Sequence, residues 1–242
     1  MIDSAAPDIA IEFQLSSDFK EILPGASPSE ARAAVVDRYG PEVVATLPPA
    51  LLDEAVSQFE AISELLRQAG IFHASVCLGR VGERVTLSSL TFGRMEADCT
   101  DPAVAVAGIL RIKGRGQGSD RRDIKRFDLP CGPAAVVIET AVGLLLPAGE
   151  LGTAKDLPLP VATLQAYIPV PKEADRSRRS MVVVTFSTPS IQHWEAYCPV
   201  LVDLLRSLRF PTGAQGAIAS VDTKAEPLVA VSTRSRISDA LG

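Results

Sequence analysis

Hydrophobic and polar residues alternate along several short stretches of this chain, and each of these stretches is typical of a strand. From Ile9 to Leu15 every second residue is large and apolar, which predicts a half-buried strand because successive strand side chains point to opposite faces. Further strands are predicted over residues 71–81, 84–95, 127–129, 134–146, 164–170 and 181–188. Gly82-Glu83 joins the strands 71–81 and 84–95 as a hairpin, since glycine at the first turn position suits a type II′ turn.

Apolar residues recur at intervals of three and four in other stretches, and these predict helices. Ser27-Pro28-Ser29-Glu30 combines a capping serine, a first-turn proline and a capping-box glutamate, so a helix should run to about Tyr39 and stop at Gly40-Pro41. Pro48-Pro49 opens a longer helix over residues 50–69. Its apolar stripe consists of Leu51, Leu52, Val56, Phe59, Ile62, Leu65 and Leu66.

Two more helices are expected later in the chain. Thr100-Asp101-Pro102 starts one that runs to about Ile112, with Val104, Ile109, Leu110 and Ile112 mainly inward. The other follows the strand 181–188, and its core-facing stripe consists of Trp194, Tyr197, Cys198, Leu201, Val202, Leu205 and Leu208. Pro199 lies inside that pattern, where it removes a backbone donor, so a kink or an effective helix start is expected there.

The order of these elements predicts the fold class. Strands and helices do not alternate strictly, and most strands are joined by hairpins. We therefore expect an α+β fold with a largely antiparallel sheet of about six or seven strands flanked by helices. Residues 9–210 should form a single globular domain, preceded by a flexible N-terminus at 1–8. Residues 211–242, poor in large apolar side chains, should form a disordered C-terminal tail.

Composition and charge narrow the function classes. The chain has 242 residues, of which 47% are hydrophobic and 22% charged, and a net charge of −5. That charge disfavours general nucleic-acid binding and binding to an anionic membrane surface, which both need excess Lys and Arg. No apolar run approaches the ~20 residues that span a bilayer. With no targeting signal in MIDSAAPDIAIEF, a cytoplasmic location is expected.

Candidate chemistry is sparse. Cys77, Cys99, Cys131 and Cys198 are scattered without CxxC spacing, so we expect neither a metal nor a redox site from them. His73 shares a strand face with Cys77, but strand residues four apart are about 13 Å apart, too far for a hydrogen bond. A nucleophile pair would need His73 to meet Cys131 or Cys198 across the fold.

Two other candidates have simpler interpretations. His193 and Glu195 are two apart in a helical stretch and face different directions, which disfavours a metal site. Cys131 lies in a Pro-Cys-Gly-Pro turn, which is typical of a bend that redirects a strand. We therefore assign no catalytic, cofactor-binding or metal-binding residue and expect no cofactor.

A basic, glycine-rich stretch at 113–126, KGRGQGSDRRDIKR, is expected to be an exposed, mobile connection. Its GxGxG spacing matches neither the dinucleotide fingerprint nor the P-loop. If it contacts a phosphate or an acidic partner, the candidate contact residues are Arg121, Arg122, Lys125 and Arg126.

Several segments resemble known proteins. LPCGPAAVVIET at 129–140, LQAYIPVP at 164–171 and VTFSTPSIQHWEAYCPVLVDLLRSLRF at 184–210 resemble a group of uncharacterised actinobacterial proteins. With LLRQAGIFHASVCLGR at 65–80, this resemblance covers roughly residues 9–210. The ending at 184–210 also resembles that of the PsbP-like fold, the photosystem extrinsic-protein fold. That resemblance implies an antiparallel sheet sandwiched by helices that serves mainly as a binding scaffold, and it brings no catalytic residue.

Three functions follow as hypotheses. The first is a cytoplasmic, non-enzymatic binding or scaffold protein whose partner is another protein, contacted through the tail or the basic stretch. The second is an enzyme with a Cys/His site assembled only by the fold. The third, by analogy with PsbP-like proteins, is an accessory component of a secretion or cell-envelope system.

Overall fold

The structure is a computed structural model, and it describes residues 9–115, 122–146, 148, 155–175, 177, 179–211 and 219–223. For residues 144–146 and 219–223 only the backbone path is described. The elements in chain order are β1 (Glu12–Ser16), β2 (Phe19–Ile22), α1 (Pro28–Tyr39), α2 (Pro41–Thr46), α3 (Pro49–Gln68), β3 (Ile71–Val81), β4 (Arg84–Glu96), α4 (Pro102–Gly114), β5 (Arg122–Leu129), β6 (Gly132–Leu146), β7 (Leu157–Pro169), β8 (Ser180–Thr188), the 3₁₀ turn η1 (Ile191–His193), α5 (Trp194–Ser207) and β9 (Ala219–Thr223).

Within the described residues, seven strands form one antiparallel sheet in the order β2-β3-β4-β8-β7-β6-β5. The predicted α+β class and strand number are therefore confirmed. The last strand of this sheet in the chain, β8, lies between β4 and β7, so the order of the strands in space differs from their order in the sequence. β1 lies outside the sheet and pairs in parallel with β9.

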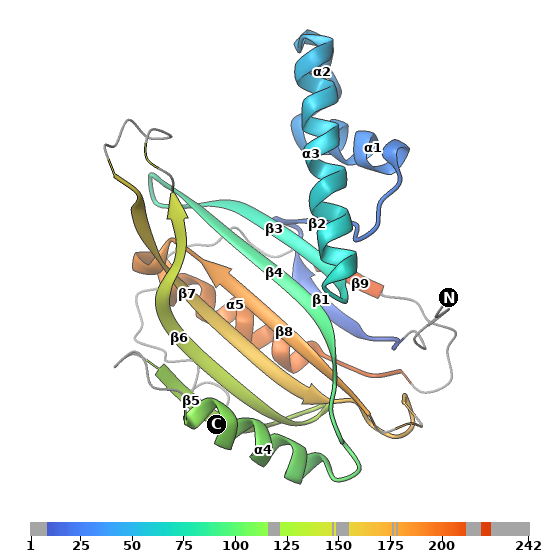
Figure 1. Ribbon diagram of the computed structural model, residues 1–242, viewed down its shortest axis with the longest axis vertical. Coiled ribbons are helices and arrows are strands. Elements are labelled where there is room, and N and C mark those ends of the chain that lie inside the picture. Colours follow the sequence, from blue (N-terminus) through green and yellow to red (C-terminus); the bar gives the residue numbers. More distant parts are fainter. Residues whose placement is uncertain are drawn as a thin grey trace.

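One face of the sheet packs against α5 and β1, and this side holds the main core (Figure 1). The apolar residues of β8 that point to it, Val182, Val184 and Phe186, contact the stripe of α5 in the same buried cluster. In α5, Tyr197, Leu201 and Leu205 are fully buried, as predicted. Trp194 packs at the edge of this cluster, 6.0 Å from the ring of Phe186.

Among the residues that the structure describes, those that cover the other face lie at its two edges. Ala74 and Val76 of β3 pack with α1 and α3, and Ala135, Val137 and Tyr167 pack with α4. Ala74 and Val137 belong to one row of cross-strand partners that runs across the sheet, so both lie on the same face. Figure 1 accordingly shows α3 and α4 at opposite ends of one face, with α5 behind the sheet.

Helix-capping and turn residues in the sequence predicted several element boundaries correctly. Ser27 and Glu30 form the predicted capping box, and α1 ends at Gly40. The Asp101 side chain caps α4 through Oδ1, which accepts from Ala103 N and Val104 N. The β3–β4 hairpin turns at Gly82, whose φ of 62° lies in the left-handed region that glycine tolerates.

Several predicted faces were wrong. Val104 and Ile112 of α4 are each 66% exposed, and the buried residue is Val106. In α3 the expected single stripe is divided, because Leu52, Val56 and Phe59 are buried while Leu51, Ile62 and Leu65 are exposed. Both helices lie at an edge of the sheet, so only some of the apolar residues of each helix contact the sheet and its neighbouring elements.

Other boundaries also differ from the predictions. Residues 122–126, expected in a mobile connection, form most of the edge strand β5, and β7 begins at Leu157, ahead of the strand predicted over residues 164–170. α2 was not predicted. α5 begins at Trp194, so Pro199 lies inside the helix and does not start it. Residues 219–223 of the predicted tail form β9, while 1–8, 212–218 and 224–242 lie outside the described residues.

No helix in the described residues is long and apolar enough to cross a membrane.

Candidate functional site

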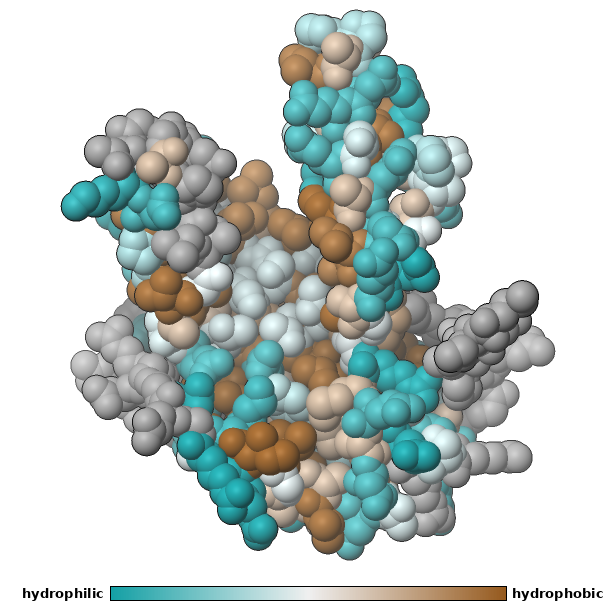
Figure 2. Space-filling view, viewed as in Figure 1, coloured by the Kyte–Doolittle hydropathy of each residue, from teal (hydrophilic) through white to brown (hydrophobic). Residues whose placement is uncertain are grey.

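The middle of this face, which none of the described helices covers, is the strongest candidate for a functional surface in the described part of the chain, and we call it the open face. It lies over β4, β8 and β7, between the edge covered by α1–α3 and the edge covered by α4. Figure 2 shows this face as a hollow with a pale, near-neutral floor beside the projecting arm that contains α2 and α3.

Two rows of cross-strand partners make the floor. In one row Ser89, Ser187 and Thr163 are successive partners on β4, β8 and β7. In the other row Thr91, Thr185 and Gln165 are successive partners on the same strands. All six side chains point away from α5 and are partly exposed. Their regular spacing follows from the strands, which lie about 4.8 Å apart.

The hydroxyl groups of this floor are free to bind. Among the residues that the structure describes, Ser89, Thr91, Thr163, Thr185 and Ser187 make no side-chain hydrogen bond. Each hydroxyl offers one donor and two acceptor positions. The floor therefore presents a dense set of hydrogen-bonding groups that the fold itself does not use.

Charged residues close the α4 end of the open face. Lys113 extends from α4, its Nζ lying 3.4 Å from Oε1 of Gln165 and 5.2 Å from the centre of the Tyr167 ring. Lys113 has no ion pair within the described part of the chain. The row of Ser89, Ser187 and Thr163 continues into the paired residues Glu139 and Arg122. This end of the floor thus carries one cation whose charge is not neutralised by a neighbouring carboxylate.

Apolar side chains lie at the opposite end of the same face. Leu78 and Leu87 are cross-strand partners near the β3–β4 turn, and they are 71% and 45% exposed. The open face therefore changes from apolar near the β3–β4 turn to polar and basic near α4.

The predicted partner contacts are only partly brought to this face. Arg122 borders it, but its guanidinium is engaged: Nε donates to Glu139 Oε2 at 2.7 Å and Nη1 to Lys113 O at 3.2 Å. Arg126 pairs with Asp128, and Lys125 lies 3.7 Å from Asp123. Arg121 lies outside the described residues. None of the three described residues is therefore a free cation.

The structure does not bring the predicted Cys/His candidates together. His73 is buried beside the stacked rings of Phe13 and Phe92, with its ring centre 5.0 and 5.3 Å from theirs, and its Nδ1 lies 3.3 Å from Glu21 Oε1. None of its described contacts is with a cysteine. Burial raises the pKa of Cys77 and of Cys131 to about 11, which suppresses the thiolate needed for nucleophilic attack.

Metal ligation finds no support in the described residues, where no group of three or more His, Cys, Asp or Glu side chains could hold an ion. His193 lies in the 3₁₀ turn that precedes α5, and Glu195 in the first turn of α5.

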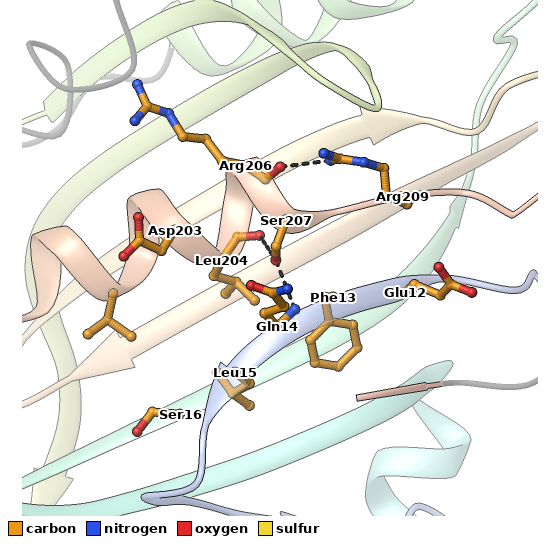
Figure 3. A pocket seen from close by; sticks show the side chains of 11 residues that line it. Glu12, Phe13, Gln14, Leu15, Ser16, Asp203, Leu204, Arg206, Ser207 and Arg209 are labelled. Carbon is orange, nitrogen blue, oxygen red and sulfur yellow. Dashed lines mark hydrogen bonds between the residues drawn. The ribbon is translucent and has the colours of Figure 1, made fainter. Parts of the chain in front are cut away.

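A second hollow lies beside β1, with a volume of about 570 Å³ (Figure 3). Its walls come from β1 and the last turns of α5. Its polar groups are used structurally: the Ser207 hydroxyl accepts from Gln14 N, and Arg209 Nη1 donates to Arg206 O. Because these groups hold β1 against α5, this hollow is a weaker candidate than the open face.

No protein-family model, curated protein or solved structure matches this chain significantly.

Sequence reasoning missed the floor residues, although a signal was present. In β4, β7 and β8 small polar residues alternate with buried apolar ones, as in Ser89-Leu90-Thr91 and Thr185-Phe186-Ser187. That pattern marks one polar face per strand. It could not show that the three polar faces adjoin, because the position of β8 between β4 and β7 is not encoded locally.

Proposed function

We propose that this protein is a non-enzymatic binding protein that holds a segment of another protein on its open face. The observation that carries the proposal is the floor of five free hydroxyl groups on β4, β8 and β7. Internal strands have their backbone groups paired within the sheet, so recognition on this face falls to side chains. A floor built for hydrogen bonding without an activated nucleophile suits binding better than catalysis.

The dimensions of the open face favour a narrow occupant. Its three strands span roughly 10 Å from β4 to β7, which is close to the diameter of one helix with its side chains. The apolar end at Leu78 and Leu87 would shelter apolar residues of that segment. Lys113 at the other end favours an acidic residue or the carbonyl end of a helix.

Two further parts of the proposal come from the sequence. A cytoplasmic location is expected, and subcellular fractionation would test it. The resemblance of residues 184–210 to the end of the PsbP-like fold implies a binding scaffold, which agrees with the proposed role.

Site-specific photocrosslinking in cells tests the proposal. A photoreactive phenylalanine analogue at Thr185, in the middle of the floor, should give a discrete covalent adduct with one protein. The same analogue at Lys172, in the exposed β7–β8 loop, is the matched control and should give none.

A second set of variants links the adduct to the floor. Thr91→Arg fills the hollow and Lys113→Glu reverses its charge, and either should strongly reduce the Thr185 adduct while thermal unfolding stays cooperative. An adduct that is unaffected by both changes, an equal adduct from Lys172, or no adduct from Thr185 would each contradict the proposal.

A further inference from the structure

Lys113 borders the open face as a partly buried cation whose neighbours leave its charge unbalanced. Its Nζ lies 3.4 Å from the amide oxygen Oε1 of Gln165 and 5.2 Å from the centre of the Tyr167 ring. α4, the helix that carries Lys113, contains no acidic residue. Among the described residues no carboxylate lies within ion-pair distance of its Nζ. A cation that is partly withdrawn from water in this way favours a ligand that brings a negative charge.

Gln165 is held with its amide oxygen toward Lys113 and Tyr167. The Tyr167 hydroxyl donates to Gln165 Oε1 at 2.8 Å, and Lys113 Nζ donates to the same oxygen. Because an ammonium group can only donate, this contact fixes which end of the amide faces Lys113. Nε2 of Gln165, with its two N–H groups, finds no acceptor in the described part of the chain. Gln165 therefore uses its acceptor within the fold and leaves its donors to a ligand.

Thr185 adds a third donor beside this pair. It is the cross-strand partner of Gln165, so the two side chains stand next to each other on the open face. Its hydroxyl makes no hydrogen bond to a described residue. An ammonium, an amide and a hydroxyl group from α4, β7 and β8 thus meet at one place, and all three can donate. The ligand group that suits them accepts several hydrogen bonds and carries a negative charge.

The charge of this cluster favours a carboxylate over a phosphate. One unpaired cation balances the single charge of a carboxylate, whereas a phosphoryl group carries about −1.5 to −2 at neutral pH and is usually bound by several arginines. The guanidinium of Arg122, which borders the open face, is already held by Glu139 Oε2 and by the carbonyl of Lys113. It therefore adds no unpaired charge to the cluster.

The type of donor favours an acidic side chain over a chain terminus. Proteins that capture a terminal carboxylate do so with a concave set of backbone N–H groups. Here the donors are side chains, because the backbone groups of the internal strands β7 and β8 are paired within the sheet.

We infer that Lys113, Gln165 and Thr185 form a subsite for the carboxylate of an aspartate or glutamate side chain in the bound protein segment. This inference rests on the proposed function, and it adds the chemical group by which the segment is anchored. The three residues would make the open face specific for segments that bring an acidic residue to the α4 end.

Carbodiimide coupling tests the inference, because this reagent joins an amine to a carboxylate that touches it. The photoreactive analogue is placed at Ser89, which lies on the floor but outside the subsite, and its adduct with the partner is purified after irradiation. Carbodiimide treatment followed by mass spectrometry should show an amide bond between Lys113 Nζ and an Asp or Glu side chain of the partner. Lys125, half exposed on the neighbouring strand β5, is the matched control and should form no bond to the partner.

A substitution of nearly identical shape removes the charge of the subsite. Gln165→Glu places a carboxylate beside Lys113, so the partner should lose its cation and the yield of the Ser89 adduct should fall at least roughly tenfold. Gln192→Glu adds the same charge in the exposed turn η1 and should leave the yield unchanged. Lys113→Arg keeps a cation and should retain most of the adduct. Thermal unfolding of each variant shows that the fold is intact.

Treatment with a phosphatase separates a carboxylate from a phosphate. Cell lysate is irradiated with and without prior phosphatase treatment, and the yield of the Ser89 adduct should be the same in both. Loss of the adduct after this treatment would assign the subsite to a phosphorylated residue and overturn the inference.

The remaining outcomes separate the inference from the proposed function. A Ser89 adduct without a bond from Lys113, a bond to the terminal carboxyl group of the partner, or an equal yield from Gln165→Glu and Gln192→Glu would overturn the inference alone. Absence of an adduct from both Ser89 and Thr185 would overturn the proposed function and the inference together.

Discussion

The hydroxyl of Ser207 and the backbone amide of Gln14 join the two ends of the folded domain. Ser207 Oγ accepts from Gln14 N at 2.8 Å and donates to Leu204 O at 2.7 Å (Figure 3). Two residues away from Gln14 and from Ser207, Glu12 and Arg209 exchange a pair of backbone hydrogen bonds of 2.9 Å. The serine side chain therefore continues the pairing with β1 at the residue where the chain leaves α5, and it holds β1 against this helix.

Removing this hydroxyl should loosen the attachment of β1. We expect Ser207→Ala to lower the free energy of unfolding by about 0.5–1.5 kcal/mol, the usual net value of one hydrogen bond. Urea unfolding followed by Trp194 fluorescence measures the change. Ser57→Ala, on the exposed side of α3, is the control and should have no effect beyond its small helix preference. Equal stabilities for Ser207→Ala and the native chain would show that water replaces the bond.

Two leucines that look equivalent in sequence should behave differently. Leu205 of α5 is fully buried in the main core, whereas Leu65 of α3 is 65% exposed. Leu205→Ala should cost about 2–5 kcal/mol because it leaves a cavity, and Leu65→Ala should change stability by less than about 0.5 kcal/mol. Chemical denaturation of both variants checks this, and a large loss of stability for Leu65→Ala would contradict its exposed position on α3.

The carboxylate of Glu21 should make the stability of the β2 edge depend on pH. The hydrogen-bonding contact with His73 lowers the pKa of Glu21, burial opposes this shift, and the charge interaction with His73 adds to it. A carboxyl in the unfolded chain titrates near about 4.3, above the folded value. The stabilisation by Glu21 is therefore complete above the pKa of the unfolded carboxyl, and it is lost as the pH falls through the lower pKa of Glu21 in the folded chain.

The variant Glu21→Gln measures this contribution. The difference in unfolding midpoint between the native chain and the variant should be larger at pH 6 than at pH 3, because acid protonates the carboxyl group. Glu83→Gln, in the exposed β3–β4 turn, is the control for a general effect of removing one carboxylate. A difference that grows toward acid pH would contradict the assignment.

Much of the fold could be predicted because its signals are local. The capping box of Ser27 and Glu30, the turn at Gly82 and the stripe of α5 each lie within a few turns of the chain, and each appears as expected. The last part of β5, residues 127–129, was predicted as a strand, but residues 122–126 were not, because they belong to an edge strand where polar side chains such as Asp123 and Lys125 face solvent.

The candidate site depended on information that is not local. The floor exists because β8 lies between β4 and β7, which brings Thr91, Thr185 and Gln165 into one row. The exposed part of the α3 stripe exists because this helix meets the sheet only at its edge, so the same apolar arc is half buried and half exposed. Neither relationship can be deduced from the spacing of apolar and polar residues in the sequence alone.

The cysteines should react slowly at neutral pH. Cys77, Cys99 and Cys198 are buried, and Cys131, partly exposed, has its pKa raised to about 11 by burial. At pH 7.5 a thiol of that pKa is roughly 0.03% thiolate. Iodoacetamide followed by peptide mass spectrometry should modify Cys131 first, at a rate that rises with pH up to about 11. Rapid labelling of any native cysteine at pH 7 would instead restore the hypothesis of a reactive thiol.

The ion pair of Arg122 and Glu139 should matter more for the fold than the neighbouring charges do. Arg122 bonds both to Glu139 and to the carbonyl of Lys113, so it ties β5, β6 and the end of α4 together, and both side chains are only about a quarter exposed. Arg122→Ala should lower stability by about 1 kcal/mol, since a charge-assisted hydrogen bond and a helix-end carbonyl lose their partner.

Lys125→Ala is the matched control, because its contact with Asp123 is 3.7 Å long and half exposed, and such surface pairs contribute little. Exchanging the pair, as Arg122→Glu with Glu139→Arg, should recover the ionic part of the loss but not the bond to the Lys113 carbonyl. The doubly exchanged chain should therefore unfold at a temperature between those of the native chain and of Arg122→Glu. Full recovery would show that the carbonyl of Lys113 is satisfied by water, and no recovery would show that the two charges do not interact.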